Sequence, residues 1–204
     1  MNKTIGALIT SIIIYIGIIF TVAAQDSGDI GCLETVWKRT NPTEAEKQFD
    51  IENDKGILGG LFSCEYNVSA TQVQSLLDVL KAAAETGDAQ ELSTLLIYPQ
   101  TYMAKLKQKD RDGNIYEFIL MENEIDFISL FDKITADPFK DIISCTRLSN
   151  LDPIGQVGIH VASGYIRFKK SPKTNQLKIS ELNTLTKSQN GWLNKYCNQS
   201  NTAQ

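Results

Sequence analysis

Four cysteines and one histidine are the residues of this 204-residue chain whose chemistry can be assigned first. An even number of cysteines predicts two disulfides when a chain is exported, and three pairings are possible. We favour Cys32–Cys64, which would close an N-terminal loop, and Cys145–Cys197, which would tie the C-terminal tail to the core. Because the cysteines lie far apart and His160 has no neighbouring ligand, we expect no redox centre, no metal and no cofactor.

His160 is the only histidine that could act as a general base. Such a base needs a carboxylate to orient its ring, and Asp126 and Asp132 of a predicted helix are the acidic candidates by type. These two aspartates do not share one helix face, which argues against a carboxylate pair. The sequence therefore favours a hydrogen-bonded or exposed strand histidine over a catalytic one. Whether the chain is an enzyme stays open, with the balance against it.

Four residues are candidates for lining a ligand pocket, namely Tyr98, His160, Tyr165 and Arg167. Tyr98 has a simpler alternative, because a Tyr-Pro pair ends a helix and packs against the core. A strand alternates its side chains between two faces. We accordingly expect His160 to share one face with a set of neighbours in a single strand: Gly158, Ala162, Ile166 and Phe168.

The N-terminus has the pattern of a signal peptide. Lys3 precedes an almost wholly apolar run over residues 5–20, and Val22 and Ala24 suit a signal-peptidase site. We predict cleavage between Ala24 and Gln25, and export to the periplasm. The alternative is an uncleaved anchor in the inner membrane, because the apolar stretch is just long enough to span a bilayer.

The overall charge excludes one large class of partners. The chain carries 20 Lys and Arg against 24 Asp and Glu, a net charge of −4. Lys3 is the only charged residue of the predicted signal peptide, so cleavage would leave a net charge of −5. A chain with no basic excess does not have the electrostatic footprint of a nucleic-acid-binding protein.

Two consecutive helices are the clearest predicted elements. Ser69 starts a capping box, Gly87 ends the first helix, and Asp88 starts a second helix that ends before Pro99. The first helix has one apolar face, formed by Val73, Leu76, Leu77, Leu80 and Ala84. Shorter helices are predicted over residues 42–49 with Asn41 as cap, after Asn123, and after Pro138.

Strands are predicted mainly in the second half of the chain, over residues 115–120, 156–168 and 177–185. Helices followed by strands indicate an α+β domain, with a mostly antiparallel sheet covered on one face. We expect four segments: a signal peptide over 1–24, a disulfide-tethered extension over 25–68, the main domain over 69–187, and a loose C-terminal tail over 188–204.

Three stretches of the main domain occur in a suggestive order: KAAAETGD and LLIYP over residues 81–99, FISLFDKI over 127–134, and QVGIHVASGYIRF over 156–168. In them the chain resembles exported bacterial proteins of the nuclear-transport-factor-2-like (NTF2-like, cystatin-like) superfamily, a largely uncharacterised group. The resemblance covers about residues 69–185. It implies a cone-shaped α+β fold, with N-terminal helices packed on a curved sheet, and it brings no catalytic residues.

The resemblance leaves the function open, because such a cone can hold a small molecule, form an active site or be filled by side chains. We expect a protein-binding module of the envelope, of the inhibitor or immunity type, that blocks a periplasmic enzyme or toxin acting on the cell wall. The alternatives are a small-ligand binder and, less favoured, a small enzyme that uses His160. Proteins of this superfamily often dimerise through the sheet, so a homodimer is a further possibility.

Overall fold

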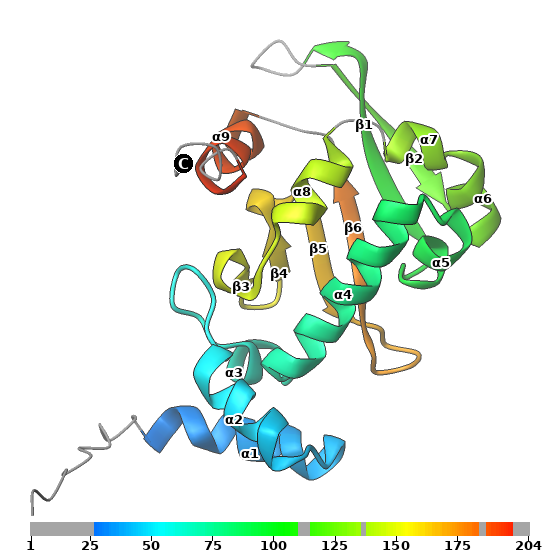
Figure 1. Ribbon diagram of the computed structural model, residues 1–204. Coiled ribbons are helices and arrows are strands. Elements are labelled where there is room, and N and C mark those ends of the chain that lie inside the picture. Colours follow the sequence, from blue (N-terminus) through cyan, green and yellow to red (C-terminus); the bar gives the residue numbers. More distant parts are fainter. Residues whose placement is uncertain (1–26, 110–114, 136–137, 184–186, 198–204) are drawn as a thin grey trace, which may run out of the picture.

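The computed structural model of the chain describes residues 27–109, 115–135, 138–183 and 187–197 (Figure 1). The helices are α1 (Ser27–Thr40), α2 (Glu44–Asn53), α3 (Phe62–Tyr66), α4 (Ala70–Thr86), α5 (Ala89–Thr94), α6 (Glu124–Ser129), α7 (Phe131–Ile134), α8 (Phe139–Cys145) and α9 (Lys187–Tyr196). None of these described helices is long and apolar enough to cross a membrane. The predicted signal peptide and its cleavage site at Ala24 and Gln25 lie outside the described residues.

The strands are β1 (Gln100–Lys109), β2 (Ile115–Met121), β3 (Asp152–Ile154), β4 (Gly158–Val161), β5 (Ile166–Lys170) and β6 (Leu177–Asn183). They form one six-stranded sheet in the order β2-β1-β6-β5-β4-β3. Strands β3 to β6 make a four-stranded antiparallel part, and β1 joins it by parallel pairing with β6. The prediction of an α+β fold with a mostly antiparallel sheet is therefore confirmed.

The long helix α4 forms where the sequence predicts it. The side chain of Ser69 accepts a hydrogen bond from the backbone N–H of Gln72, and the side chain of Gln72 accepts one from the backbone N–H of Ser69. Gly87 ends the helix with a φ of 73°, a left-handed conformation that glycine adopts without strain. The buried side of α4 belongs to the core: Val73, Leu76, Leu77, Leu80, Ala83 and Ala84.

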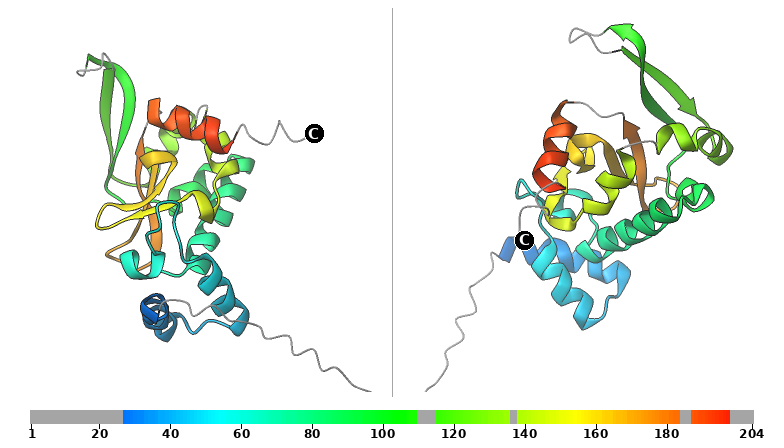
Figure 2. Two further views of the ribbon diagram at one scale, coloured as in Figure 1. Left: turned by 90° about the vertical axis from the view of Figure 1, so that its left-hand side faces the viewer. Right: turned by 45° about the horizontal axis from the view of Figure 1, so that its top comes forward.

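The two faces of the sheet differ in chemistry because side chains alternate along each strand. One face joins the core with α4, through Ile159, Val161, Ile166, Phe168, Ile179 and Leu182. In the left view of Figure 2, the strands lie on one side of the molecule and α4 on the other. The interior between helix and sheet is thus filled by apolar side chains rather than hollow.

The N-terminal extension folds into α1, α2 and α3. Besides the chain itself, side-chain hydrogen bonds join it to the main domain. The Cys32–Cys64 disulfide links α1 to α3, as predicted. The buried carboxylate of Asp50 on α2 accepts a hydrogen bond from Trp37 Nε1 at 2.8 Å and two from Thr71, one backbone and one hydroxyl, both at 2.7 Å. One side chain therefore connects α1, α2 and α4.

The structure corrects the predicted helix over residues 42–49. Helix α2 begins two residues later and runs to Asn53, with Thr43 rather than Asn41 as its cap. The reason is a local capping box: Thr43 and Glu46 satisfy each other's backbone N–H groups at the helix start. Helix α1 had no counterpart among the predicted elements.

Two predictions in the C-terminal half are also corrected. The strand predicted over 156–168 is interrupted by a 3-10 turn, Ala162–Gly164, at which all three residues have positive φ. The segment expected to be a loose tail is helical as α9, and its anchors are those proposed: Trp192 is buried, and the Cys145–Cys197 disulfide is formed.

Candidate functional site

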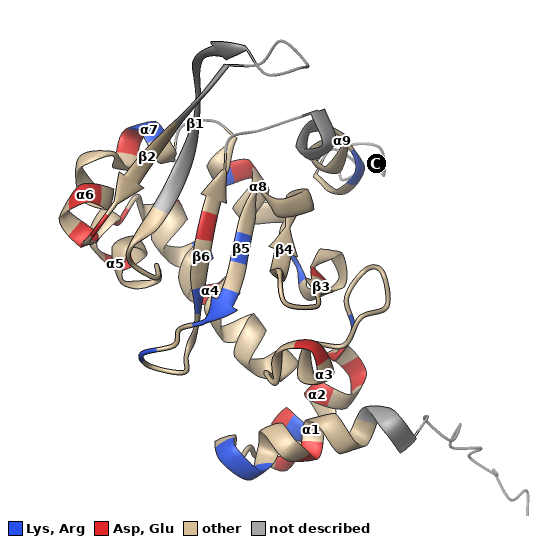
Figure 3. Cartoon of the chain, turned by 180° about the vertical axis from the view of Figure 1, so that it is seen from behind, with Lys and Arg blue, Asp and Glu red and all other residues tan. Residues whose placement is uncertain are grey.

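A row of charged and polar residues crosses the sheet on the face opposite to the core. Asp152 of β3 pairs with His160 of β4, His160 pairs with Arg167 of β5, and Arg167 pairs with Glu181 of β6. Directly opposed residues of antiparallel strands point to the same face. Figure 3 shows the Lys/Arg colour of β5 beside the Asp/Glu colour of β6. Four residues distant in sequence therefore form one line.

The β5–β6 end of the row is a fixed ion pair. Arg167 Nη1 donates to Glu181 Oε2, and both side chains are about seven-tenths buried, with relative exposures of 28% and 32%. The amide of Asn183 donates to Glu181 Oε1 at 2.9 Å and to the carbonyl oxygen of Gly164 at 2.8 Å. This network holds Glu181 in place and links β6 to the 3-10 turn that follows β4.

His160 lies next to this ion pair, and its surroundings lower the pKa of its imidazole. Burial lowers the pKa of its imidazole, the positive charges of Arg167 and Lys169 lower it further, and Glu181 acts in the opposite direction. The Nε2 atom is buried and finds no hydrogen-bond partner among the described residues. Gly164 lies close above the ring, since a Cβ on it would lie 3.7 Å from His160 Nδ1.

Asp152, the cross-strand neighbour of His160, is a carboxyl group largely withdrawn from water. Its relative exposure is 7%, and burial raises its pKa, although a hydrogen bond from the backbone of Leu58 acts in the opposite direction. Buried carboxyl groups are rare unless they are paired or serve a function. Asp152 is thus a site residue that the sequence analysis missed.

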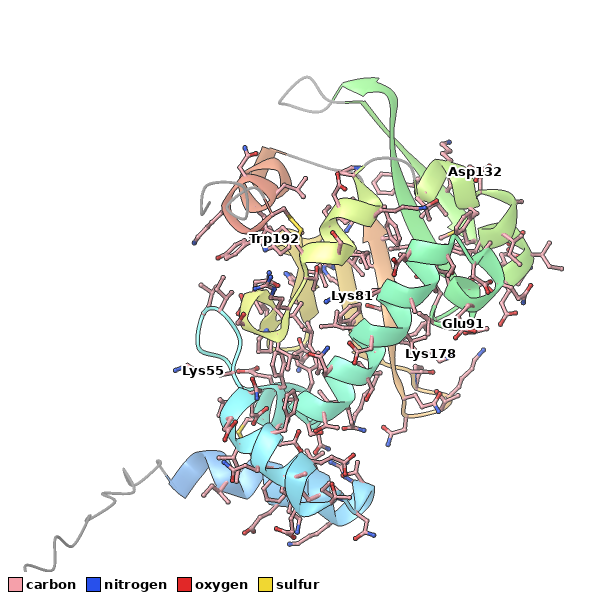
Figure 4. All side chains as sticks on the ribbon, in the orientation of Figure 1. Lys55, Lys81, Glu91, Asp132, Lys178 and Trp192 are labelled. Atoms are coloured by element: carbon pink, nitrogen blue, oxygen red, sulfur yellow. A yellow bond between two sulfur atoms is a disulfide. The ribbon has the colours of Figure 1, made fainter. Side chains whose placement is uncertain are left out.

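A cavity of about 490 Å³ opens beside this pair, at the sheet edge formed by β3. We call it the α9 pocket, and the lining residues used below are Leu58, Asp152, Ile154, His160, Ser163, Gly191, Trp192, Lys195 and Tyr196. They come from the loop after α2, from β3, from β4 and the 3-10 turn after it, and from α9. Figure 4 shows Trp192 under α9, close to the disulfide that ends this helix.

The carboxylates proposed as partners of His160 do not lie near it. Asp126 belongs to α6, which packs against α5 and β2, and strands β1, β6 and β5 separate β2 from β4. The Asp126 side chain instead accepts a hydrogen bond from the backbone N–H of Glu122 at 2.7 Å. Asp132 is exposed on α7, at the opposite end of the molecule from Trp192 in Figure 4. The structure therefore does not bring these two weak candidates together with His160, in line with the favoured interpretation of a non-catalytic strand histidine.

The proposed pocket residues are also dispersed. Tyr98 donates its hydroxyl to the carbonyl oxygen of Ser93 at 3.1 Å, and burial together with the nearby acids of α6 raises its pKa. Tyr165 is buried in the core, and Arg167 is engaged with Glu181. Of the four, only His160 lines the α9 pocket.

The cause of this dispersal is the turn at Ala162–Gly164. The turn folds the predicted single strand into the β4–β5 hairpin, so that Ile166 and Phe168 face the core, whereas His160 and Arg167 face the other way. The sequence contains one signal that could have placed Asp152 beside His160. The residues on either side of 155–157 alternate in character, as the two strands of a hairpin do. That pattern does not give the register.

A second candidate surface lies at the other edge of the sheet. We call it the β2 edge surface, formed by Phe118 and Leu120 of β2 and by Ile125 and Ile128 of α6, which packs against β2. Phe118, Leu120 and Ile125 have relative exposures of 71%, 58% and 75%.

The register shows which way the β2 side chains point. Tyr102 of β1 pairs with Ile119 of β2 and with Leu182 of β6, and both of these contribute to the core face. Phe118 and Leu120, the neighbours of Ile119 in the chain, therefore lie on the opposite face. They share that face with the row that contains Glu181 and His160.

Acidic side chains border this surface. Glu122, Glu124 and Asp126 lie at the start of α6, and Asp132 lies on α7. Figure 3 shows the Asp/Glu colour on both helices. Among the described residues, the acidic side chains gather at the start of α6, whereas α7 carries Lys133 as well as Asp132.

No group of three potential metal ligands occurs in the described part of the chain. Comparison with known families, with curated proteins and with solved structures finds no match for this chain. The site must therefore be interpreted from its own geometry.

Proposed function

We propose that this chain is an exported binding protein of the bacterial envelope that holds a protein partner on the β2 edge surface. The observation that carries the proposal is the exposure of Phe118 and Leu120, at 71% and 58%, on a strand at the sheet edge. Among the described strands, β2 pairs only with β1. An open edge strand with apolar side chains tends to pair with another chain.

The disulfides support the exported location. All four cysteines are paired, and disulfides persist in oxidising compartments such as the periplasm. The apolar N-terminal segment with its small residues at Val22 and Ala24 is the predicted export signal. The alternative is that the same segment stays uncleaved as an inner-membrane anchor. The mass of the purified chain distinguishes the cleaved from the uncleaved form.

The nature of the surface suggests the class of partner. An apolar centre bordered by Glu122, Glu124 and Asp126 suits a protein with a complementary apolar patch and a basic rim. Enzymes and toxins that act on anionic cell-wall polymers gain from a basic surface. We therefore propose an inhibitor or immunity-type role against such an enzyme, in which a rigid, disulfide-linked body loses little entropy on binding.

We further propose that residues 69–187 form an NTF2-like domain. The features that support this are the long helix α4, the short helix α5 ending before Tyr98–Pro99, and a mostly antiparallel sheet packed on α4. The filled interior between α4 and the sheet favours a binding module over an enzyme that works inside the cone.

The test compares three forms of the full-length, C-terminally tagged chain, each purified without reductant from the envelope fraction of the native host. They are the wild type, the double variant Phe118→Asp/Leu120→Asp, and a control, Leu58→Asp. Leu58 is as exposed as the two target residues, at 80%, and comes from a different segment, the loop after α2. Native mass spectra also report signal-peptide removal and the loss of four hydrogens for the two disulfides.

We expect a stoichiometric second protein with the wild type and the control, and none with the double variant. The second protein, purified separately, should lose its enzymatic or toxic activity when one equivalent of the wild type is added. Capture that survives in the double variant would place the partner elsewhere on the molecule. A spectrum containing only the chain or its homodimer would contradict the proposal.

A further inference from the structure

The α9 pocket is built as a small-molecule site, independent of the β2 edge surface. Its volume of about 490 Å³ falls within the common range for ligand sites, roughly 300–1,000 Å³. Its walls come from three separated parts of the chain, and α9 is fixed in place by the Cys145–Cys197 disulfide. A preformed cavity of this kind does not require the protein to reorganise on binding.

The polar groups of the pocket can both donate and accept hydrogen bonds. Asp152 and His160 are cross-strand neighbours, and the pKa of the imidazole is lowered. Ser163, at a φ of 56° in the strained turn after β4, also lines the cavity and adds a hydroxyl group. The set therefore suits a ligand with several hydroxyl groups.

The part of the wall that α9 supplies is aromatic. Trp192 and Tyr196 of α9 lie with their ring centroids 5.2 Å apart, and Leu58 and Ile154 add apolar surface. Aromatic rings pack well against flat, weakly polar C–H faces. A pocket with both hydrogen-bonding groups and aromatic rings in its wall fits a ring that has polar edges and apolar faces.

Charges of both signs lie at the pocket, so neither an anionic nor a cationic ligand is selected. No arginine lines the pocket, and the Asp152 carboxyl would oppose an anion. Lys195 lies at the wall with its Nζ 5.0 Å from the centre of the Tyr196 ring, while Arg167 and Lys169 lie close to His160. Arg167 is already paired with Glu181, so the remaining charges of Asp152 and Lys195 offset each other and favour a neutral ligand. Because Asp152 already accepts a hydrogen bond from the backbone of Leu58, a purely apolar ligand would chiefly leave the buried imidazole unsatisfied, which is costly.

We propose that the α9 pocket binds a neutral sugar ring, with the hydroxyl groups directed to Asp152, His160 and Ser163 and a C–H face packed on the aromatic wall. The ring is either a free sugar or one unit of a glycan. The pocket lies at the sheet edge formed by β3, five strands away from the β2 edge. Sugar binding and partner binding are therefore separable by mutation.

The test is an NMR titration of the mature, oxidised wild type with glucose, N-acetylglucosamine and N,N′-diacetylchitobiose, each added separately. The chain has one histidine and two tryptophans, so the signals are readily assigned. Trp37 is an internal control, because its indole N–H donates to Asp50 in the N-terminal extension. We expect at least one sugar to shift the Trp192 and His160 signals saturably and to leave the Trp37 signal unchanged.

The decisive variant is Gly191→Leu. Apart from its chain neighbours and the nearby backbone of α9, nothing lies within 4 Å of the position that a Cβ on Gly191 would take, and Gly191 lines the pocket, so we expect a leucine to fit and to narrow the cavity. We expect loss of the saturable shifts with a melting temperature at or above that of the wild type. Asp152→Ala should weaken sugar binding at least about tenfold, because one good hydrogen bond to a charged group is lost. The control Asp132→Ala, which changes an exposed aspartate, should bind sugar like the wild type.

Several outcomes would overturn the proposal. One is that none of the three sugars gives a saturable shift, and another is that the shifts persist in Gly191→Leu. A third is that inorganic phosphate or spermidine shifts the Trp192 and His160 signals while the sugars do not. A response to the disaccharide alone would identify a glycan rather than a free sugar as the ligand and would support the proposal.

Discussion

The two edges of the sheet present different surfaces to possible partners. At one edge, β3 has three residues, and the loop after α2 and helix α9 lie against it to form a cavity. At the other edge, β2 has seven residues and exposes Phe118 and Leu120. A short, covered edge is protected from pairing with another chain, whereas a long apolar edge is available for it. One sheet thus carries a cavity at one edge and exposed apolar side chains at the other.

The covering of the β3 edge depends on a covalent link that the β2 edge does not have. Helix α9 follows β6 in the chain but lies beside the 3-10 turn that comes after β4. The Cys145–Cys197 disulfide fixes the end of α9 to the end of α8. The comparison therefore teaches that a disulfide holds the helix that lines the α9 pocket, whereas neither disulfide links an element of the β2 edge surface.

The largest expected effect comes from removing this link with the double variant Cys145→Ser/Cys197→Ser. The two cysteines are separated by 52 residues, for which loop-entropy reasoning gives a stability loss of about 4 kcal/mol. Denaturant unfolding at neutral pH measures the loss. Since α9 would no longer be held over the β3 edge, sugar binding should disappear while partner binding persists.

The matched control is Cys32→Ser/Cys64→Ser, in which the separation is 32 residues and the expected loss about 4 kcal/mol as well. This variant should keep the shifts of Trp192 and His160 on sugar addition. If both variants lose sugar binding alike, the disulfide at α9 has no specific part in forming the pocket.

A gain of stability is expected at the same edge from Gly191→Leu. Glycine inside a helix costs about 0.8–1 kcal/mol relative to alanine, and leucine is close to alanine. Because the Cβ meets nothing within 4 Å apart from its chain neighbours and the nearby backbone of α9, most of this difference should appear as increased stability in thermal unfolding followed by circular dichroism. A decrease would mean that α9 packs more closely against the pocket than the structure shows.

The row of Asp152, His160, Arg167 and Glu181 across the sheet predicts that two substitutions change the pKa of His160 in opposite directions. Arg167 lowers this pKa and Glu181 raises it, so Arg167→Met should move it up and Glu181→Gln should move it down. Titration of the imidazole signals by NMR measures both. Lys47→Met, which removes a charge from the exposed pair with Glu44, serves as the control and should leave the pKa of His160 unchanged. Shifts of the same sign in the two test variants would disprove the row as an electrostatic unit.

The smallest expected effects concern the pH dependence of stability. The pKa of His160 is lowered on folding from 6.5, so the unfolded chain binds more protons and stability falls as the pH drops below about 6.5. The pKa of Asp152 is raised from 3.8, so the folded chain binds more protons and this contribution is lost as the pH rises above 3.8. Below about pH 6.5, the free energy of unfolding should therefore vary less with pH in His160→Gln than in the wild type. Above pH 3.8, it should vary less in Asp152→Asn than in the wild type.

The elements that could be predicted are those fixed by neighbours in the chain. Helix α4 follows from its capping box, its apolar face and Gly87, and β6 from its alternating pattern. The preferred cysteine pairing is confirmed at both disulfides. By contrast, β1 and α1 carry no strong local signal, and neither was predicted. The turn at Ala162–Gly164 places two non-glycine residues in a left-handed conformation, which local preference disfavours.

The sequence by itself determined the class of the fold and the start and end of α4, because capping and periodicity act over a few residues. Only the tertiary structure decided which carboxyl group accompanies His160. Asp152 reaches it through strand register, while Asp126 and Asp132 are held away by three intervening strands. Register and helix placement depend on contacts between distant segments, and no local pattern specifies them. The α9 pocket and the β2 edge surface are both products of that long-range packing.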